Sequence, residues 1–220
     1  MDTITLLKMN EIFSDLQEGE LQIVTGLIKL RTIPKNVLII NEGDSSDAMY
    51  LIKEGKVDVM TTNEKGEQFV FSTLKEGDNF GELSLLDGNP RSASVLTLEK
   101  CVFAVLHKDD FRRLIKHSPG IVDGVVKYLC NRIRFITSIA QSMALMDVYG
   151  RLTKFLLEQV TNKEDGKLII GFPYTKQTIA AHIGCRRESV SRIFNDLKRG
   201  GYLIEEDNRI IINKKFPNAW

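Results

Sequence analysis

The stretch TKQTIAAHIGCRRESVSRIFNDLKRGG, Thr175–Gly201, decides the fold of this chain. It begins with Thr175, a residue type that caps helix N-termini, and Gly184 interrupts the helical pattern that follows. Apolar residues recur at helical spacing on both sides of that glycine. They are Ile179, Ala180 and Ile183 in the first helix and Val190, Ile193, Phe194 and Leu197 in the second. Two helices joined by a glycine-containing turn predict a helix-turn-helix, whose second helix lies in the major groove of DNA.

The outer face of the second expected helix carries side chains suited to reading DNA bases. Arginine donates two hydrogen bonds to guanine, and glutamate accepts one from the cytosine amino group. Arg187 and Glu188 begin this helix, and Arg192 lies about one turn further along the same face. The residues expected to contact DNA are Thr175, Gln177, Arg187, Glu188, Ser189, Ser191 and Arg192. A merely solvated helix face is the alternative, but the next segment, KRGGYLIEEDNRIIIN, predicts a two-stranded wing and favours DNA binding.

A long helical pattern precedes this domain, over residues 110–146. Within it, apolar residues alternate at spacings of four and three over about three heptads. They are Val122, Val126, Leu129, Ile133, Ile136, Ala140 and Met143. The stripe favours a coiled coil with a second copy of the chain, and packing on its own domain is the alternative. The segment DVYGR, residues 147–151, is the expected hinge. A helix, RLTKFLLEQV, and a hairpin over residues 161–175 are expected after it.

The first 109 residues predict mainly short strands. A helix is expected over residues 11–30, where apolar residues recur at helical spacing. Beyond it, short runs rich in β-branched and aromatic residues alternate with glycine-containing turns, which is typical of a β-roll. We therefore expect an α+β chain in three parts: an N-terminal β-roll, or double-stranded β-helix, over residues 1–109, a central dimerisation helix over residues 110–146, and a winged helix-turn-helix over residues 147–220.

Between two of the expected strands, the segment FGELSLLDGNPRSAS, Phe80–Ser94, is neither a good strand nor a good helix. A tight turn at Gly81 that leads into a short helix can bind an anion through backbone N–H groups. Arg91 and Ser92 can add a guanidinium and a hydroxyl for a phosphate, and Glu82 can accept a hydrogen bond from a ribose hydroxyl. A structural ion pair between Arg91 and Glu82 is an equally open alternative.

This segment resembles the phosphate-binding cassette of cyclic-nucleotide-binding domains. The preceding run IPKNVLIINEGDSSDAMYLIKEGKVDV is similar to their β-roll, and DVYGRL and IGCRRESVSRI resemble the hinge and recognition helix of bacterial catabolite activators. Over residues 10–213 the chain is similar to the CRP/FNR family of homodimeric transcription regulators. The resemblance implies ligand contacts at Gly81, Glu82, Leu83, Ser84, Arg91, Ser92, Arg132 and Thr137, with Thr137 reaching the ligand's base from the partner subunit.

The same resemblance implies the partners. It implies an allosteric cyclic nucleotide such as cAMP, no prosthetic group, a two-fold symmetric DNA operator and RNA polymerase. Arg187, Glu188 and Arg192 fall on base-reading positions that imply TGTGA-like half-sites. Ile136 departs from the pattern, because cAMP-responsive regulators have a threonine there that contacts the adenine amino group. The alternative is therefore a constitutive or otherwise-gated DNA-binding regulator of this type, whose β-roll no longer binds a cyclic nucleotide.

The composition is consistent with such a protein and excludes other classes. The 220 residues carry a net charge of +1, but residues 148–220 hold 13 Lys and Arg against eight Asp and Glu, which favours a polyanionic partner. Three separated cysteines argue against disulfides and against a zinc or iron–sulfur site. With no signal-peptide pattern and no apolar run of about 18 residues, the chain is expected to be cytoplasmic. Catalytic motifs such as a Walker A loop or HExxH are missing, so no enzyme activity is expected.

Overall fold

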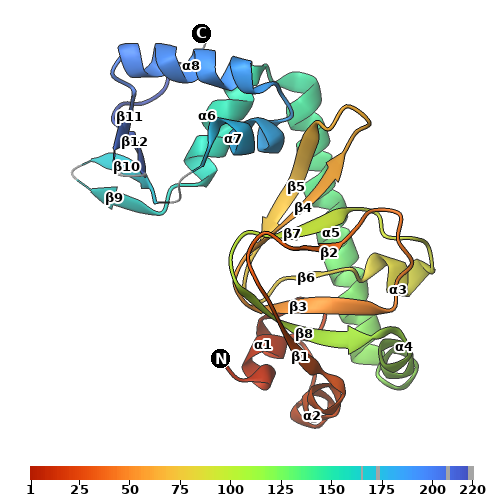
Figure 1. Cartoon of the computed structure of the whole chain (residues 1–220). Helices are drawn as coiled ribbons and strands as arrows, with labels where there is room; N and C mark the ends of the chain where they lie inside the picture. Colours follow the sequence, from red (N-terminus) through yellow and green to blue (C-terminus); the bar gives the residue numbers. More distant parts are fainter. Residues whose placement is uncertain (165, 172–173, 207–208, 218–220) are drawn as a thin grey trace. The chain divides into compact units, whose positions relative to one another are not determined.

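The computed structural model describes residues 1–164, 166–171, 174–206 and 209–217. The chain forms two compact units (Figure 1). The first contains residues 1–61 and 71–135, and the second contains residues 62–70 and 136–220. The longest helix, α5 (Pro119–Leu145), contributes residues to both units.

The first unit is built around a β-roll of two four-stranded sheets, of which only residues 62 and 68–70 belong to the second unit. One sheet has the strand order β1-β8-β3-β6 and the other β2-β7-β4-β5. The strands are β1 (Lys29–Ile33), β2 (Leu38–Ile40), β3 (Ala48–Glu54), β4 (Val57–Thr62), β5 (Gln68–Leu74), β6 (Asn79–Phe80), β7 (Ser94–Thr97) and β8 (Cys101–His107). These short strands confirm the fold class that the spacing of the glycine turns predicts.

Strands β3 and β8 are buried on both faces. They pair antiparallel, and successive side chains of a strand point to opposite faces. Tyr50 and Phe103 therefore enter a core between the two sheets, where they pack edge to face, whereas Leu51 and Leu106 enter a second core on the other side. This double burial explains why both strands read as nearly continuous apolar runs.

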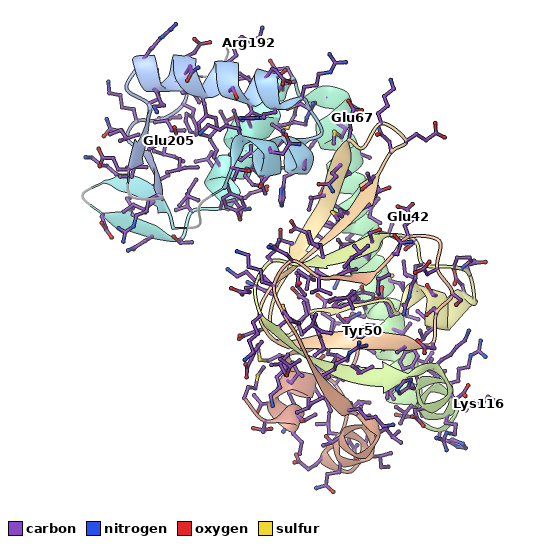
Figure 2. The ribbon with its side chains drawn as sticks, viewed as in Figure 1. Glu42, Tyr50, Glu67, Lys116, Arg192 and Glu205 are labelled. Carbon is purple, nitrogen blue, oxygen red and sulfur yellow. The ribbon has the colours of Figure 1, made fainter. Side chains whose placement is uncertain are left out.

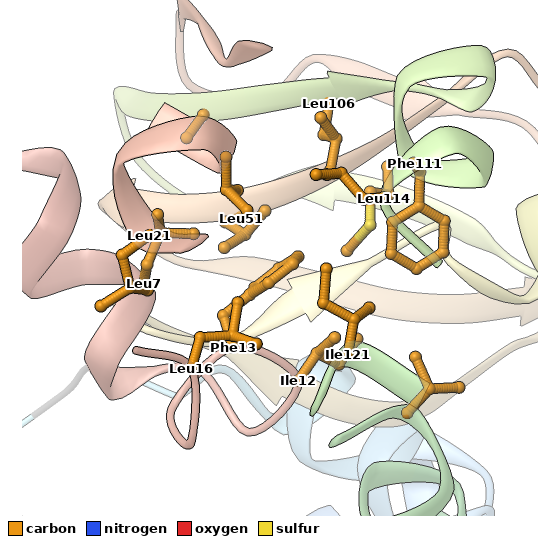
Figure 3. Close-up of a cluster of buried hydrophobic side chains, with 14 of the residues drawn as sticks. Leu7, Ile12, Phe13, Leu16, Leu21, Leu51, Leu106, Phe111, Leu114 and Ile121 are labelled. Atoms are coloured by element: carbon orange, nitrogen blue, oxygen red, sulfur yellow. The ribbon is translucent and has the colours of Figure 1, made fainter. Parts of the chain in front are cut away.

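Helices cover the outer face of β3 and β8 and complete the second core (Figure 3). They are α1 (Thr3–Met9), α2 (Glu18–Leu27), α4 (Lys108–His117) and the first turns of α5. Helix α5 lies very close to the turn that follows α1. A Cβ at Gly124 would lie only 2.1 Å from the carbonyl oxygen of Ile12. Only glycine therefore permits this contact between α5 and the N-terminal segment.

The single helix expected over residues 11–30 is wrong. Residues 11–15 form a turn, and α2 starts only at Glu18. The start is fixed by Glu20, whose carboxylate accepts a hydrogen bond from the backbone N–H of Gln17 at 3.1 Å. The apolar residues of the turn still face the core, so burial rather than helical structure accounts for their spacing.

The expectation of one continuous helix over residues 110–146 is also wrong. The chain forms α4 and α5 with a break at Ser118, because a proline disfavours the helical conformation at the residue before it. Ser118 is extended, with φ −130° and ψ 101°, and Pro119 starts α5. The hydroxyl of Ser118 donates to Glu20, which attaches the break to α2.

The second unit combines three helices with a sheet. The helices are α6 (Val148–Glu158), α7 (Lys176–Ile183) and α8 (Arg187–Arg199), and the strands are β9 (Asn162–Glu164), β10 (Lys167–Ile170), β11 (Leu203–Glu206) and β12 (Arg209–Ile212). The helix-turn-helix, hairpin and wing are thus confirmed in the described residues. Residues 165, 172–173 and 207–208 of the predicted hairpin and wing lie outside them. The sequence did not predict that β10 pairs with β12, which joins hairpin and wing into one sheet, β11-β12-β10-β9.

The predicted apolar faces of α7 and α8 form the centre of this unit. All seven of their residues are buried, together with Leu152 and Leu156 of α6 and Ile210 of β12. The expected break before α6 is also confirmed. Asp147 caps α6, because its Oδ1 accepts a hydrogen bond from the backbone N–H of Gly150 at 2.7 Å.

Candidate functional site

The segment Phe80–Ser94 forms a tight turn, a short helix and an extended return to the roll. Strand β6 ends at Phe80, and the φ of 80° at the next residue, Gly81, lies in the left-handed region that favours glycine. Helix α3 (Leu83–Asp87) follows, as the sequence predicts. A Cβ at Gly81 would lie 2.5 Å from Nη1 of Arg91. The glycine therefore permits the turn and also lets Arg91 reach the backbone.

Arg91 is buried, with 6% of its surface exposed, and the main chain engages its guanidinium. Nη1 donates to the carbonyl oxygen of Gly81 and Nη2 to that of Ala48, both at 2.6 Å. Burial lowers the pKa of Arg91, while nearby Tyr50, Asp47 and Glu82 act in the opposite direction. The direct Arg91–Glu82 ion pair that the sequence left open is not formed between these two described residues. Arg91 instead stabilises the fold of its own segment.

Glu82 is also buried, with 4% of its surface exposed, and both carboxylate oxygens accept hydrogen bonds. The hydroxyl of Tyr128, on α5, donates to Oε1 at 2.8 Å, and Nδ2 of Asn79 donates to Oε2 at 3.2 Å. Burial raises the pKa of Glu82 above its ordinary value, and hydrogen bonds together with the charge of Arg132 partly offset this effect.

Sequence reasoning missed Tyr128 and Asn79. Tyr128 precedes Arg132 by four residues and therefore shares its face of α5. Asn79 lies two residues before Gly81. Their positions next to predicted ligand residues were the available signal, but the sequence does not show which face of α5 packs on the roll.

The residues predicted to bind a ligand meet at one small cavity of about 60 Å³. Seven of the eight line it: Gly81, Glu82, Leu83, Ser84, Arg91, Ser92 and Arg132. Thr137 is exposed on α5 and is not among the lining residues. Small-molecule pockets usually have about 300–1,000 Å³. The cavity is therefore too small for a nucleotide in this conformation, and Tyr128 and Arg132 form part of the wall that closes it.

The helix-turn-helix presents its predicted DNA-contacting residues on an open face. Thr175 caps α7, because its Oγ1 accepts a hydrogen bond from the backbone N–H of Thr178 at 3.0 Å, and Gly184 makes the turn with a φ of 61°. Ser189 and Ser191 are half-buried. The other predicted residues are exposed: Thr175, Gln177, Arg187, Glu188 and Arg192. Figure 2 labels Arg192 on this outer side of α8. The face is basic, polar and free to approach a nucleic acid.

Glu205 of β11, labelled in Figure 2, links the wing to both helices of the motif. Its Oε1 accepts a hydrogen bond from Lys176 at the start of α7, and its Oε2 accepts one from Lys198 near the end of α8 at 2.9 Å. The Nζ of Lys176 also lies 3.9 Å from the centre of the Phe194 ring, a cation–π contact. These contacts hold the wing and the recognition helix in a fixed mutual position.

Two faces of helix α5 differ in how far their apolar residues are buried. Ile121 and Val125 are buried in the core of the first unit, and Leu129 is half-buried against it. The other six residues of the predicted stripe are exposed: Val122, Val126, Ile133, Ile136, Ala140 and Met143. Ile133 exposes 65% of its surface and Val126 exposes 55%. One face of α5 therefore packs on the roll, and a different face carries an exposed apolar stripe.

A further cavity lies apart from the predicted ligand and DNA residues. The second unit has a larger cavity of about 680 Å³ between α6, the β9–β10 hairpin and the residues after β12, and no predicted site residue lines it. Among the described residues, no group of three or more His, Cys, Asp or Glu is placed to hold a metal ion. Within the same residues, no helix combines the length and hydropathy needed to span a membrane.

Two known protein domains match this chain in sequence. The cyclic nucleotide-binding domain matches residues 30–118, which hold the β-roll and the cassette. The Crp-like helix-turn-helix domain matches residues 150–215, which hold α6, the helix-turn-helix and the wing. The two matches thus cover the two places where the predicted ligand and DNA residues gather.

Proteins of similar sequence match this chain over most of its length. A CRP-like cAMP-activated global transcriptional regulator of Mycobacterium tuberculosis is 26% identical over 205 residues, 92% of each chain. A cAMP-activated global regulator of Salmonella typhimurium is 29% identical over 185 residues, 81% of this chain and 87% of its own.

Solved structures share the fold. A c-di-GMP-responsive regulator of Xanthomonas campestris superposes with a TM-score of 0.80 at 19% identity, over 90% of this chain and all of the other. The catabolite activator protein of Thermus thermophilus gives a TM-score of 0.54 at 26% identity, over 93% and 94% of the two chains. The two relatives are named global transcriptional regulators, and the two solved structures are named a global regulator and a catabolite activator. The two domains, their order and these relatives show that the chain belongs to the CRP/FNR family of DNA-binding transcription regulators.

Proposed function

We propose that this regulator binds DNA as a homodimer under the control of a cyclic nucleotide, with cAMP the first ligand to test. The observation that carries the proposal is the convergence of seven predicted ligand residues on one cavity. The cAMP-activated relatives support the choice of ligand. The effector acts by binding the DNA-competent arrangement more tightly than the other arrangements.

The chemistry of the cavity suits each part of a cyclic nucleotide. Arg91 and Ser92 supply a guanidinium and a hydroxyl for the phosphate. Glu82 supplies an acceptor for the ribose hydroxyl, and Arg132 brings a second cation to the same wall. Arg91 must exchange carbonyl partners for phosphate oxygens, so ligand binding rearranges the turn at Gly81. In this proposal Thr137 of the partner subunit completes the site beside the base.

The DNA-binding reaction follows from the exposed face of α8. Arg187 and Arg192 donate to guanine and Glu188 accepts from cytosine, which fits TGTGA-like half-sites. Two recognition helices must read half-sites about 34 Å apart, so the operator has two-fold symmetry. The exposed stripe on α5 supports the dimer, because a second copy would remove it from water. RNA polymerase is the proposed further partner at the promoter.

The test combines calorimetry with a DNA gel shift. The full chain is titrated with cAMP and with cGMP, and a symmetric TGTGA-containing duplex is shifted at one stated salt concentration. Ser92→Ala is the variant of choice, because Arg91→Ala would also remove two hydrogen bonds from the fold. Ser14→Ala, at an exposed turn, is the matched control. Binding that Ser92→Ala weakens, together with a ligand-dependent shift, supports the proposal.

A ligand-independent regulator is the second candidate. The small cavity, the internal partners of Arg91 and the apolar Ile136 favour it. In that case the cassette acts as a structural element, and the dimer binds DNA constitutively. A full gel shift without nucleotide, and no heat with either nucleotide, would select this candidate.

A further inference from the structure

Tyr128 lies in the wall that separates two neighbouring cavities of the first unit, here called the partition. The small cavity at the cassette and a neighbouring cavity of about 270 Å³ share four lining residues. They are Leu74, Asn79, Tyr128 and Arg132. The neighbour is formed by the same face of α5, further along the helix, and by the segment around Asn10, and its volume is more than four times that of the cavity of the cassette.

A buried chain of hydrogen bonds holds Tyr128 in this partition. Its hydroxyl donates to Glu82, and Asn79 donates to the other carboxylate oxygen. Asn10 then donates to Oδ1 of Asn79 at 2.8 Å and to the carbonyl of Gly77 at 2.9 Å. Asn10, Asn79 and Glu82 expose 1%, 5% and 4% of their surfaces. Water therefore cannot easily replace any member, and the position of the phenol is well defined.

We propose that Tyr128 is the gate residue of the ligand cavity and an internal competitor for Glu82. Its hydroxyl occupies the acceptor that a ligand hydroxyl needs, and its ring closes the wall. Entry of a ligand then exchanges the Tyr128–Glu82 hydrogen bond for a ligand–Glu82 hydrogen bond. The inference rests on the proposed function and adds to it the residue that sets effector affinity.

The neighbouring cavity gives the displaced phenol a place to go. It is lined by polar groups, among them Asn131 and Glu11, which hydrogen-bond each other at 3.2 Å, and Asp78. A hydroxyl that turns away from Glu82 finds new partners there, so opening does not leave it unpaired. Rotation of one side chain thereby enlarges the ligand cavity while α3 and the sheets keep their positions.

The positive charge of Arg132 acts on one carboxylate on each side of the partition. Its charge acts on Glu82 in the small cavity and on Asp78 in the larger one, and it favours the ionised form of each carboxylate. Glu82 therefore keeps a cation nearby when the phenol leaves. This charge makes an open state accessible even though Glu82 is buried.

The test is calorimetry of the full chain with cAMP, comparing the wild type with Tyr128→Phe. The substitution keeps the ring but removes the competing hydroxyl, so cAMP should bind about tenfold more tightly. The 2′-deoxy analogue should gain by a similar factor and stay weaker than cAMP in both proteins, because the gate opens for either ligand. Tyr149→Phe is the matched control, since it removes another hydrogen-bonded tyrosine hydroxyl, and it should leave affinity unchanged. Unchanged or weaker cAMP binding by Tyr128→Phe would overturn the proposal.

A ligand-free measurement separates failure of the gate from failure of the proposed function. Absence of cAMP and cGMP binding in every protein would reject the cyclic-nucleotide effector. The gate is then judged by carbon-13 NMR titration of the Glu82 carboxyl, which Tyr128 and Arg132 face from α5 and Arg91 faces from the cassette. Tyr128→Phe should raise the pKa of Glu82, because it removes a donor to the charged form. An identical titration in both proteins would contradict the gate.

Discussion

Gly124→Ala tests how closely α5 is packed on the N-terminal segment. The new Cβ would lie 2.1 Å from the carbonyl oxygen of Ile12 and 2.9 Å from its carbonyl carbon. Ordinary van der Waals contact begins near 3.4 Å, so α5 and this turn must separate by about 1 Å. The obstacle is backbone, which cannot rotate away as a side chain can. Tyr128 lies one turn further along α5, so the shift also stretches its bond to Glu82.

The expected cost follows from two opposed effects. Overpacking of a close contact costs about 1–3 kcal/mol. Alanine is favoured over glycine inside a helix by about 1 kcal/mol, which offsets part of that cost. Gly26→Ala in α2 isolates the second effect, because nothing lies within 4 Å of a Cβ there. The difference between the two variants is then the packing cost alone, about 1–3 kcal/mol.

Differential scanning calorimetry and urea unfolding measure this difference. Gly26→Ala should raise the free energy of unfolding and Gly124→Ala should lower it. For a chain of this size, each kcal/mol moves the midpoint temperature by about 2–4 °C. If Gly124→Ala is as stable as Gly26→Ala, the close contact between α5 and Ile12 does not exist, and the inferred position of Tyr128 loses its support.

Three further predictions concern the ligand site, the dimer and DNA. Burial raises the pKa of Glu82, so its contribution to stability is complete below the ordinary pKa of 4.5 and is lost as the pH rises through the folded-state value. Glu82→Gln should therefore melt higher than the wild type at neutral pH, with a gain that shrinks toward pH 4.5, and equal gains at all pH values would contradict it. Ile133→Glu replaces a side chain that is 65% exposed on α5 and should cost the proposed dimer about 2–4 kcal/mol. Sedimentation that stays dimeric at micromolar concentration would refute the proposed α5 interface. Arg187→Ala should lose about 1–3 kcal/mol of affinity for its operator in a gel shift and relax one base position, whereas Arg199→Ala, at the other end of α8, should leave base preference unchanged.

The DNA-binding unit could be predicted from the sequence because its signals are local. A capping threonine, a glycine turn and apolar residues at helical spacing all act within a few residues of one another. The wing was predicted as an isolated hairpin for the same reason. Its pairing with the hairpin after α6 depends on contacts between residues more than 30 positions apart, such as Ile170 with Ile210, and local pattern contains no information on them.

The helical errors in the first unit have a common cause. The spacing of apolar residues indicates which residues are buried. It indicates a helix only where the backbone stays helical from one apolar residue to the next. Ile12 and Phe13 are buried in a turn, so their spacing from the apolar residues of α2 resembles that of one helix. Pro119 indicates a helix break at Ser118, but the apolar residues at helical spacing on both sides of it favour one continuous helix.

The ligand residues show a different limit of sequence reasoning. Their types suit a cyclic nucleotide, yet the same groups are satisfied inside the protein without one. Arg91 reaches the carbonyl of Ala48, 43 residues away, and Glu82 takes a hydroxyl from Tyr128, 46 residues away. In the proposed regulator, effector affinity therefore equals the free energy of the new ligand contacts minus that of the internal contacts they replace. A ligand that displaces the internal partners of both groups but supplies a new partner to only one leaves the other group buried without its donor or acceptor, which costs about 1–3 kcal/mol. Under the proposed function, selectivity then comes from the requirement that one molecule carry both an anionic phosphate and a free hydroxyl at the spacing of Arg91 and Glu82.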